Sequence, residues 1–302
     1  MAKKEFYSFY PGCSSQSKAS ADNFLRSSNA MCDALDIKLK EIDDWNCCGA
    51  SIGYAGGSEI PRLSLSARNI ALSQQQHGNA DIVAPCAACW ISTREAKERV
   101  EHSPKASQGV NAALSEIGLK VEANAMPEAR HMVEVLIEDI GLDTIANGIS
   151  KPLEGIKIAG YVGCQTNRPF GIAGESYENP VYLDHMIEAC GAKAVDNYEK
   201  KVSCCSGALM FSEPEKGHAL VKEIIEAAYD GGADMIVTPC QLCQMNVESY
   251  QRNINKTFGT KFNIPVVYYT QLIAVAYGKS SQEAALDGQM IRASKLEDIA
   301  NK

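Results

Sequence analysis

The chain has 302 residues, of which 45% are hydrophobic and 22% charged, and its formal net charge is −8. These values are typical of a globular protein large enough for two domains. The negative charge argues against a nucleic-acid partner, because binding phosphates requires a basic surface. The sequence has no apolar run of about 18 residues and no signal-peptide core, so we expect a cytoplasmic protein without a membrane span.

The first half of the chain alternates predicted strands and helices. Apolar runs that end at Gly or Pro predict buried strands, and apolar residues repeating at helical spacing predict helices. The expected elements are a strand over residues 5–10, helices over 21–35 and 63–76, a strand over 79–84 and a helix over 90–100.

The second half repeats this order. The expected elements are a strand over residues 156–162, helices over 181–189 and 216–229, a strand over 232–238, a helix over 244–253, a strand over 266–269 and a helix over 271–277. The alternation predicts an α/β fold with two pseudo-symmetric domains, each a small parallel sheet with flanking helices. We place the domains at residues 1–150 and 151–302, because glycines and a proline mark a linker over 141–155. The polar residues 280–302 are expected to form a tail.

Ten of the twelve cysteines form one pattern that occurs twice: Gly-Cys, an adjacent Cys pair and Pro-Cys-x-x-Cys. The gaps are 33 and 37 residues in the first copy and 39 and 34 in the second. Because thiolates are soft ligands and a reducing compartment disfavours disulfides, the repeat predicts two equivalent metal-cluster sites. The first set is Cys13, Cys47, Cys48, Cys86 and Cys89, and the second is Cys164, Cys204, Cys205, Cys240 and Cys243.

The position of these cysteines relative to the strands supports a ligand role. Gly-Cys and Pro-Cys follow predicted strands, so the thiols should meet at the carboxyl edge of each sheet, where ligands bind in open α/β folds. A cubane cluster uses four thiolates, and five per half predict an irregular coordination. Structural zinc and a thioredoxin-like dithiol are the alternatives, although zinc takes four ligands and the dithiol needs only two thiols.

The two-copy pattern resembles the cysteine-rich CCG domain and, over essentially the whole chain, the B-subunit family of heterodisulfide reductases. Further similar segments are Ser66-Ala67-Arg68-Asn69, Glu178-Asn179-Pro180 and Tyr268-Tyr269-Thr270-Gln271-Leu272. The resemblance implies that each five-cysteine set holds a non-cubane [4Fe-4S] cluster and that the two clusters face one another across a pseudo-twofold axis. It also implies an oxidoreductase in which a disulfide enters between the clusters and receives one electron from each.

The resemblance also implies partners, namely a ferredoxin-like [4Fe-4S] subunit of the C type and a flavin subunit of the A type. The chain itself lacks the dinucleotide fingerprint Gly-x-Gly-x-x-Gly. Residues 14–18 are similar to the branch from sulfur-oxidising bacteria, in which lipoate-bound sulfur is the expected substrate and the reaction runs oxidatively. The alternative functions are an electron-relay subunit without its own substrate site and a zinc-stabilised scaffold.

A few residues outside the thiol sets carry separate expectations. Cys32 and Cys190 lie among apolar helical neighbours and are expected to be buried thiols. Arg168 is the candidate cation for an anionic substrate, with a surface salt bridge as the alternative. The second Cys pair is followed by Ser206 before its glycine, which puts that loop's geometry in question. The remaining expectations are a helix-end role for His77, a helical position for His131, and a turn rather than a phosphate loop for Gly53, Gly56 and Gly57.

Overall fold

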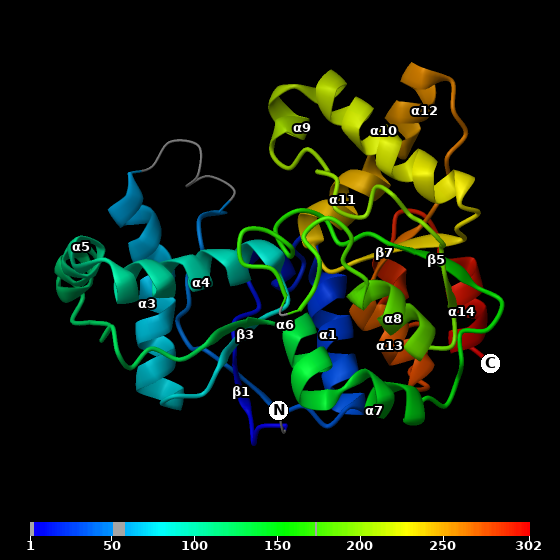
Figure 1. Ribbon diagram of the computed structural model, residues 1–302. Coiled ribbons are helices and arrows are strands. Elements are labelled where there is room, and N and C mark those ends of the chain that lie inside the picture. Colours follow the sequence, from blue (N-terminus) through cyan, green and yellow to red (C-terminus); the bar gives the residue numbers. More distant parts are fainter. Residues whose placement is uncertain (1–2, 51–57, 173) are drawn as a thin grey trace.

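The computed structural model describes residues 3–50, 58–172 and 174–302. Within these residues the chain forms two four-stranded parallel sheets flanked by helices, which confirms the predicted α/β class (Figure 1). The first sheet has the order β2-β1-β3-β4 and the second β6-β5-β7-β8, so the two halves share one topology. The strands are β1 Tyr7–Phe9, β2 Leu39–Glu41, β3 Ile82–Ala84, β4 Ala129–His131, β5 Lys157–Gly160, β6 Lys193–Ala194, β7 Met235–Thr238 and β8 Val266–Tyr268.

The helices cover both faces of each sheet. In the first half they are α1 Asp22–Ala34, α3 Glu59–His77, α4 Ala87–His102, α5 Pro104–Ser115, α6 Met132–Glu134, the π-helical segment η2 Val135–Ile140 and α7 Leu142–Asn147. In the second half they are α8 Tyr182–Ala189, α9 Leu209–Ser212, α10 Pro214–Asp230, α11 Gln241–Ser249, α12 Gln251–Phe258, α13 Tyr269–Ala276 and α14 Ser294–Ala300. Short 3-10 turns form at η1 Cys13–Ser15 and η3 Leu286–Gly288.

Strand register places the first cysteine of each copy beside its Pro-Cys-x-x-Cys motif. Ser8 of β1 pairs with Ile82 of β3, and Ile158 of β5 pairs with Met235 of β7. Because paired strands are parallel, the segments that follow them leave the sheet at one edge. The carboxyl edge of each sheet therefore carries one set of cysteines, as the sequence predicted.

One hydrophobic core is shared by both halves. Helix α1 packs against α13, and the ring of Phe24 stacks on that of Tyr268 with centroids 4.1 Å apart. The ring of Tyr269 meets Phe24 edge-on at 6.0 Å, and the hydroxyls of Ser27 and Thr270 are 2.7 Å apart. Two further cores lie under the outer helices α3–α5 and α10–α12. Helices from opposite ends of the sequence thus fill the layer between the two sheets (Figure 1).

The segments expected as linker and tail are ordered parts of this layer. The linker contains α7, and its residues Ile145 and Leu153 are buried in the shared core. The tail ends in α14, whose Leu296 and Ala300 are buried there as well. These two segments have few apolar residues, but those few are buried in the shared core and order the segments. Across the described ranges, no helix is both long enough and apolar enough to traverse a membrane.

Candidate metal centre

The five thiols of the first copy meet at the carboxyl edge of the first sheet. Cys13 opens η1 just after β1, the Cys47–Cys48 pair lies between β2 and α3, Cys86 caps α4, and Cys89 lies in the first turn of α4. Their side chains form a continuous chain of contacts in the order Cys13, Cys47, Cys48, Cys89 and Cys86. The Sγ atoms of Cys13 and Cys47 are 3.3 Å apart. Distant segments thus converge on one site.

The second copy forms the same arrangement at the other sheet. Cys240 caps α11, Cys243 lies in its first turn, and the Sγ atom of Cys243 is 3.5 Å from that of Cys205. Cys164 contacts Cys204, and Cys243 also contacts Cys240. All ten cysteines that the sequence selects are therefore gathered into two groups of five.

Neighbouring thiols in each group cannot all ionise by themselves. The hydrogen bond with Cys13 lowers the pKa of Cys47 to about 2, and the same contact raises the pKa of Cys13. In the second group, the contact between Cys164 and Cys204 lowers the pKa of Cys204 to about 6 and raises that of Cys164. One thiolate suppresses ionisation of its neighbour because like charges repel. Bound metal cations would supply the positive charge that lets all five thiols act as thiolate ligands.

A glycine lies directly against a cysteine sulfur in each group. Gly12 has a φ of 82°, and a Cβ atom there would lie 2.7 Å from the Sγ atom of Cys89. Gly163 has a φ of 74°, and a Cβ atom there would lie 2.9 Å from the Sγ atom of Cys243. The conformation and the missing side chain both require glycine. The backbone thereby approaches the sulfurs closely, as an iron–sulfur cluster site requires.

The loop after the second Cys pair keeps the geometry of the first despite its different sequence. Ser206 has a φ of 70°, close to the 72° of Gly49 at the matching position. Serine thus adopts the left-handed conformation that glycine provides in the first copy, at a steric cost. Its hydroxyl is buried and finds no hydrogen-bond partner in the described residues. The glycine stands one residue later in the second copy, yet the residue directly after the Cys pair has the same backbone conformation in both copies.

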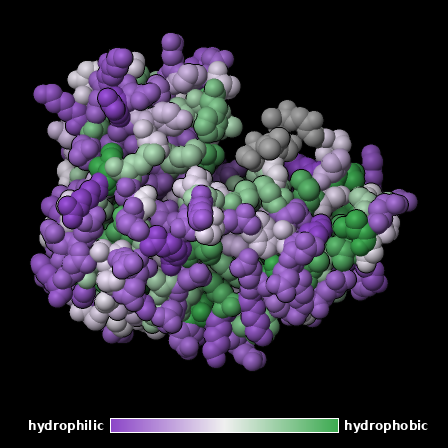
Figure 2. Space-filling model, turned by 180° about the vertical axis from the view of Figure 1, so that it is seen from behind, coloured by the Kyte–Doolittle hydropathy of each residue, from purple (hydrophilic) through white to green (hydrophobic). Residues whose placement is uncertain are grey.

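Each group has a buried side and a side open to solvent. Cys13 and Cys204 are exposed, and Cys47 and Cys164 are partly exposed. The remaining cysteines of both groups are buried, namely Cys48, Cys86, Cys89, Cys205, Cys240 and Cys243. Figure 2 shows the surface notched between the lobe of α9–α12 and the lobe of α3–α5. The first cysteine of each copy and the first of each pair thus form the accessible face.

The donors of each group are soft thiols. Among residues 3–50, 58–172 and 174–302, no group of three or more His, Cys, Asp or Glu side chains is already arranged around one ion position. The thiols are linked pairwise along a chain. The donor set of five soft sulfurs, with glycine backbone beside it, fits a multi-iron cluster in each half.

Two contacts join the groups across the middle of the molecule. Gln241, inside the second Pro-Cys-x-x-Cys, is hydrogen-bonded to the hydroxyls of both Ser14 and Ser15, beside Cys13. His131 is fully buried at the end of β4, and burial lowers its pKa to about 3, while the backbones of Pro85 and Pro239 oppose that shift. Both Pro-Cys loops therefore lie next to one neutral imidazole. The expected helical position of His131 is wrong by one residue, since it ends a strand and caps α6.

Sequence reasoning missed two tyrosines that contact the groups. The hydroxyl of Tyr10 donates to the Asn46 carbonyl at 2.8 Å, and that of Tyr161 donates to the Ser203 carbonyl at 2.7 Å. These carbonyls directly precede the two Cys pairs. Tyr10 also contacts Cys89, and the oxygen of Tyr161 is 3.9 Å from the sulfur of Cys243. The signal was available as a longer repeat, Tyr-x-Gly-Cys.

Of the expectations for residues outside the two thiol groups, three are confirmed and two are not tested. Cys32 and Cys190 are buried in the shared core, as predicted, and burial raises the pKa of each to about 12. His77 is the last residue of α3, also as predicted. Arg168 is exposed and forms no salt bridge within the described ranges, so its substrate role stays a prediction. The Gly53, Gly56 and Gly57 segment lies outside the described residues.

Comparisons with known proteins agree with this geometry. The family model "CCG: Cysteine-rich domain" matches residues 7–93 and 158–248. The chain is 31% identical over 295 residues to the 8-methylmenaquinol:fumarate reductase membrane anchor subunit of Wolinella succinogenes, covering 97% of this chain and 99% of that protein. It is 30% identical over 262 residues to the B subunit of the ferredoxin/F(420)H(2)-dependent CoB-CoM heterodisulfide reductase of Methanosarcina acetivorans, covering 85% of each.

Two further similarities concern a relative and a fold. A protein of Archaeoglobus profundus, named as similar to the heterodisulfide reductase B subunit, is 32% identical over 257 residues, 83% of this chain and 84% of that protein. The crystal structure of a hypothetical protein from Helicobacter pylori has a similar fold, with a TM-score of 0.73 and 17% identity. The match covers 95% of this chain but 52% of that one. With two CCG matches and these relatives, the chain belongs to the cysteine-rich CCG proteins of the heterodisulfide reductase B-subunit family.

Proposed function

We propose that this chain is the iron–sulfur subunit of a heterodisulfide reductase-like complex and interconverts a disulfide and two thiols. The observation that carries the proposal is the pair of five-thiol groups, each placed at the carboxyl edge of a parallel sheet and each partly open to solvent. Relatives named as heterodisulfide reductase B subunits support the reaction class. The proposal assigns one non-cubane [4Fe-4S] cluster to each group.

The ten cysteines divide into two structural roles. The buried ones would anchor a cluster against the sheet edge, with Gly12 and Gly163 admitting the backbone. The exposed Cys13 and Cys204 leave a face that a substrate sulfur can approach. When bound, iron–sulfur clusters supply one-electron redox chemistry at each site. Two sites match the two electrons that opening a disulfide requires.

The reaction balances with a reductant supplied by a partner. In the reductive direction, the S–S bond breaks and two thiols form as the disulfide takes up two electrons and two protons. The oxidative direction on a carrier-bound sulfur, with lipoate as the candidate carrier, reverses these transfers and needs an electron acceptor. Arg168, exposed four residues after Cys164, is the candidate contact for an anionic group of the substrate.

The proposal includes two protein partners. The chain has no nucleotide-binding fingerprint, so electrons must arrive or leave through other subunits. We assign that task to a ferredoxin-like iron–sulfur subunit, itself docked to a flavin subunit. Relatives named as B subunits of larger reductases are consistent with a multisubunit complex.

Anaerobic purification followed by iron, sulfide and zinc analysis tests the cofactor assignment. We expect about four iron and about four sulfide ions per five-cysteine group. Replacing Cys48 or Cys205 with serine should remove or alter the cluster of its own half only, because the two groups are separate. Cys32→Ala is the matched control and should leave both clusters intact. Stoichiometric zinc without sulfide would show that the sites are structural.

A second candidate function is electron relay without a substrate site. The Wolinella relative, similar over 97% of this chain, is named for its place in a quinol:fumarate reductase. In a relay protein the thiol groups would pass electrons between partners. Titrating the anaerobic protein with small disulfides and dithiols, lipoyl compounds included, separates the two functions. Perturbed cluster spectra support the disulfide reaction, whereas unchanged spectra with every compound favour relay.

A further inference from the structure

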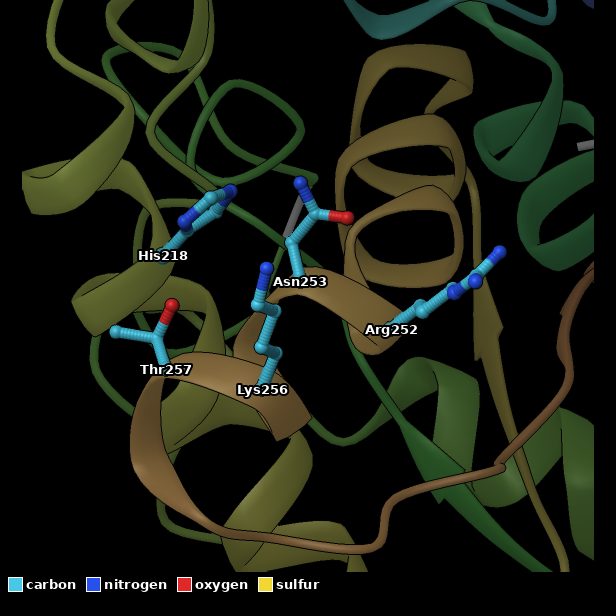
Figure 3. Close-up of a pocket in the computed structure, with 5 residues that line it drawn as sticks. All are labelled: His218, Arg252, Asn253, Lys256 and Thr257. Carbon is cyan, nitrogen blue, oxygen red and sulfur yellow. The ribbon is translucent and has the colours of Figure 1, made fainter.

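A groove between α10 and α12 lies outside both thiol groups and is lined by basic and neutral polar residues. Its volume is about 570 Å³, and its lining residues are His218, Arg252, Asn253, Lys256 and Thr257. None of these residues is acidic. Figure 3 shows His218 on α10 facing Lys256, Asn253 and Thr257 on α12, while the side chain of Arg252 extends from α12 away from these four residues. Positive charge is therefore concentrated on one concave surface.

The cations of this groove have no counter-charges within the described chain. Neither Arg252 nor Lys256 forms a salt bridge among the described residues. On α10 itself, by contrast, Lys222 pairs with Glu226 at 2.6 Å. The formal net charge of the chain is −8, so the charge of this groove is opposite in sign to that of the chain as a whole. Charge complementarity here points to a partner outside the chain.

Neutral polar side chains of the groove complement its two cations. Asn253 and Thr257 are exposed on α12 and offer an amide and a hydroxyl as hydrogen-bond donors. The ring of His218 packs against Tyr250, with centroids 5.4 Å apart, which fixes its position beside α12. A ligand oxygen in the groove would accept from the Asn253 amide and the Thr257 hydroxyl.

We infer that this groove binds the phosphate group of a small molecule. An arginine fork and a lysine ammonium are the side chains that bind phosphate oxygens most strongly. The volume lies in the range of small-molecule sites. The inference does not depend on the proposed disulfide chemistry, since no residue that lines the groove belongs to either cysteine group.

Calorimetric titration of the full chain with inorganic pyrophosphate, at an ionic strength held constant with KCl, tests this inference. We expect saturable binding that Arg252→Gln and Lys256→Gln each weaken about tenfold, because each removes a charge-assisted contact. Both side chains are exposed, so these variants should fold. The matched control is Lys261→Gln, which removes the same charge three residues beyond α12 and should leave the affinity unchanged.

Three results would overturn the assignment. Heat no greater than that of the KCl blank would show that the groove binds no pyrophosphate. Equal weakening by Lys261→Gln would show general attraction to a basic surface. Citrate serves as a carboxylate anion in a parallel titration, and affinity equal to that of pyrophosphate would contradict the phosphate class.

Discussion

The hydroxyls of Tyr10 and Tyr161 hold the loops that carry the two Cys pairs. Each donates to the carbonyl immediately before its pair and lies beside a cysteine of the same group. Burial raises the pKa of both tyrosines, so each stays protonated and remains a donor. The two contacts occupy equivalent places in the two halves. We therefore treat both tyrosines as positioning residues for the cysteine pairs.

Tyr10→Phe and Tyr161→Phe should each perturb the cluster of its own half. The Ser203 carbonyl would lose its tyrosine donor, whereas the Asn46 carbonyl would keep the Asn69 amide as a donor. Losing one such hydrogen bond costs about 0.5–1.5 kcal/mol, so we expect the larger effect from Tyr161→Phe. We expect a shifted reduction potential for one cluster and a lower melting temperature. Tyr269→Phe is the matched control, because the Tyr269 hydroxyl is buried and has no partner among the described residues. Equal effects of all three variants would contradict the positioning role.

Glu134 and Gln271 occupy the same place in the two halves. The Glu134 carboxylate accepts from the backbone of His131 at 2.6 Å, and the Gln271 amide oxygen accepts from that of Tyr268 at 2.9 Å. Burial raises the pKa of Glu134 from 4.5 to about 7, although Arg94 and Arg130 partly oppose the shift and Glu138 adds to it. Because the folded pKa lies above the unfolded value, stability falls as pH rises between these two values.

Glu134→Gln should flatten the dependence of stability on pH in that window. The replacement keeps the accepting oxygen, as Gln271 does, and removes the ionisation. A single group changes the free energy of unfolding by at most about 1.4 kcal/mol per pH unit. Melting temperatures of the wild type and the variant at about pH 5 and about pH 7.5 measure the difference. Parallel profiles for the two proteins would show that Glu134 does not titrate in this range.

The cysteines could be selected from the sequence, whereas the residues that position them could not. Cysteine is chemically distinctive, and its order and spacing predicted all ten residues that the structure brings together. Tyrosine at a strand end is also an ordinary core residue, so the repeat Tyr-x-Gly-Cys does not by itself indicate what Tyr10 and Tyr161 contact. The geometry of Ser206 was likewise hidden, because serine rarely adopts a positive φ.

At the scale of elements, the start of α11 ties the second group to the first. Gln241 holds Ser14 and Ser15 of η1, and the equivalent residue in the first copy is Ala87, which offers no side-chain hydrogen bond. The second half therefore contacts the turn that begins with Cys13, and the first half makes no equivalent side-chain hydrogen bond from Ala87. Two groups with the same cysteine pattern thus have different supporting contacts.

Gln241→Ala should alter the first cluster although the residue lies in the second motif. The hydroxyls of Ser14 and Ser15 would lose their partner, so amides in η1 should exchange hydrogen faster by about tenfold or more. The cluster spectrum of the first half should change with them. Leu242→Ala changes the other variable position of the same motif and should act on the second half alone. A change confined to the second cluster in both variants would contradict the connection.

Elements with apolar patterns were predictable and polar ones were not. The strands β1, β3, β5, β7 and β8 and the long helices have strong apolar patterns, and the structure contains each of them. The edge strands β2 and β6 are short and largely polar and exposed, so no apolar run marks them. The helix expected over residues 244–253 is divided at Tyr250 into α11 and α12, which continues to Phe258.

At the scale of the whole molecule, the two halves share one hydrophobic core. The sequence repeat predicted two sheets with one topology, and the structure confirms that. A pattern shows which face of a helix is apolar but not which element covers it. The packing of α1 on α13 was therefore invisible, and so was the burial of Leu153 in the expected linker. We propose that residues 1–150 and 151–302 each carry one site yet unfold as a single unit.

Phe24→Ala and Phe262→Ala test whether the two halves unfold together. Phe24 lies in the shared core, whereas Phe262 lies in the core under α10–α12, within the second half. Each truncation of a buried phenylalanine should cost about 3–5 kcal/mol. If the halves unfold together, both variants should reduce hydrogen-exchange protection equally in β3 and β7, because the loss in one half is transmitted through the shared core. Protection retained in β3 of Phe262→Ala would instead show that the first half is stable by itself.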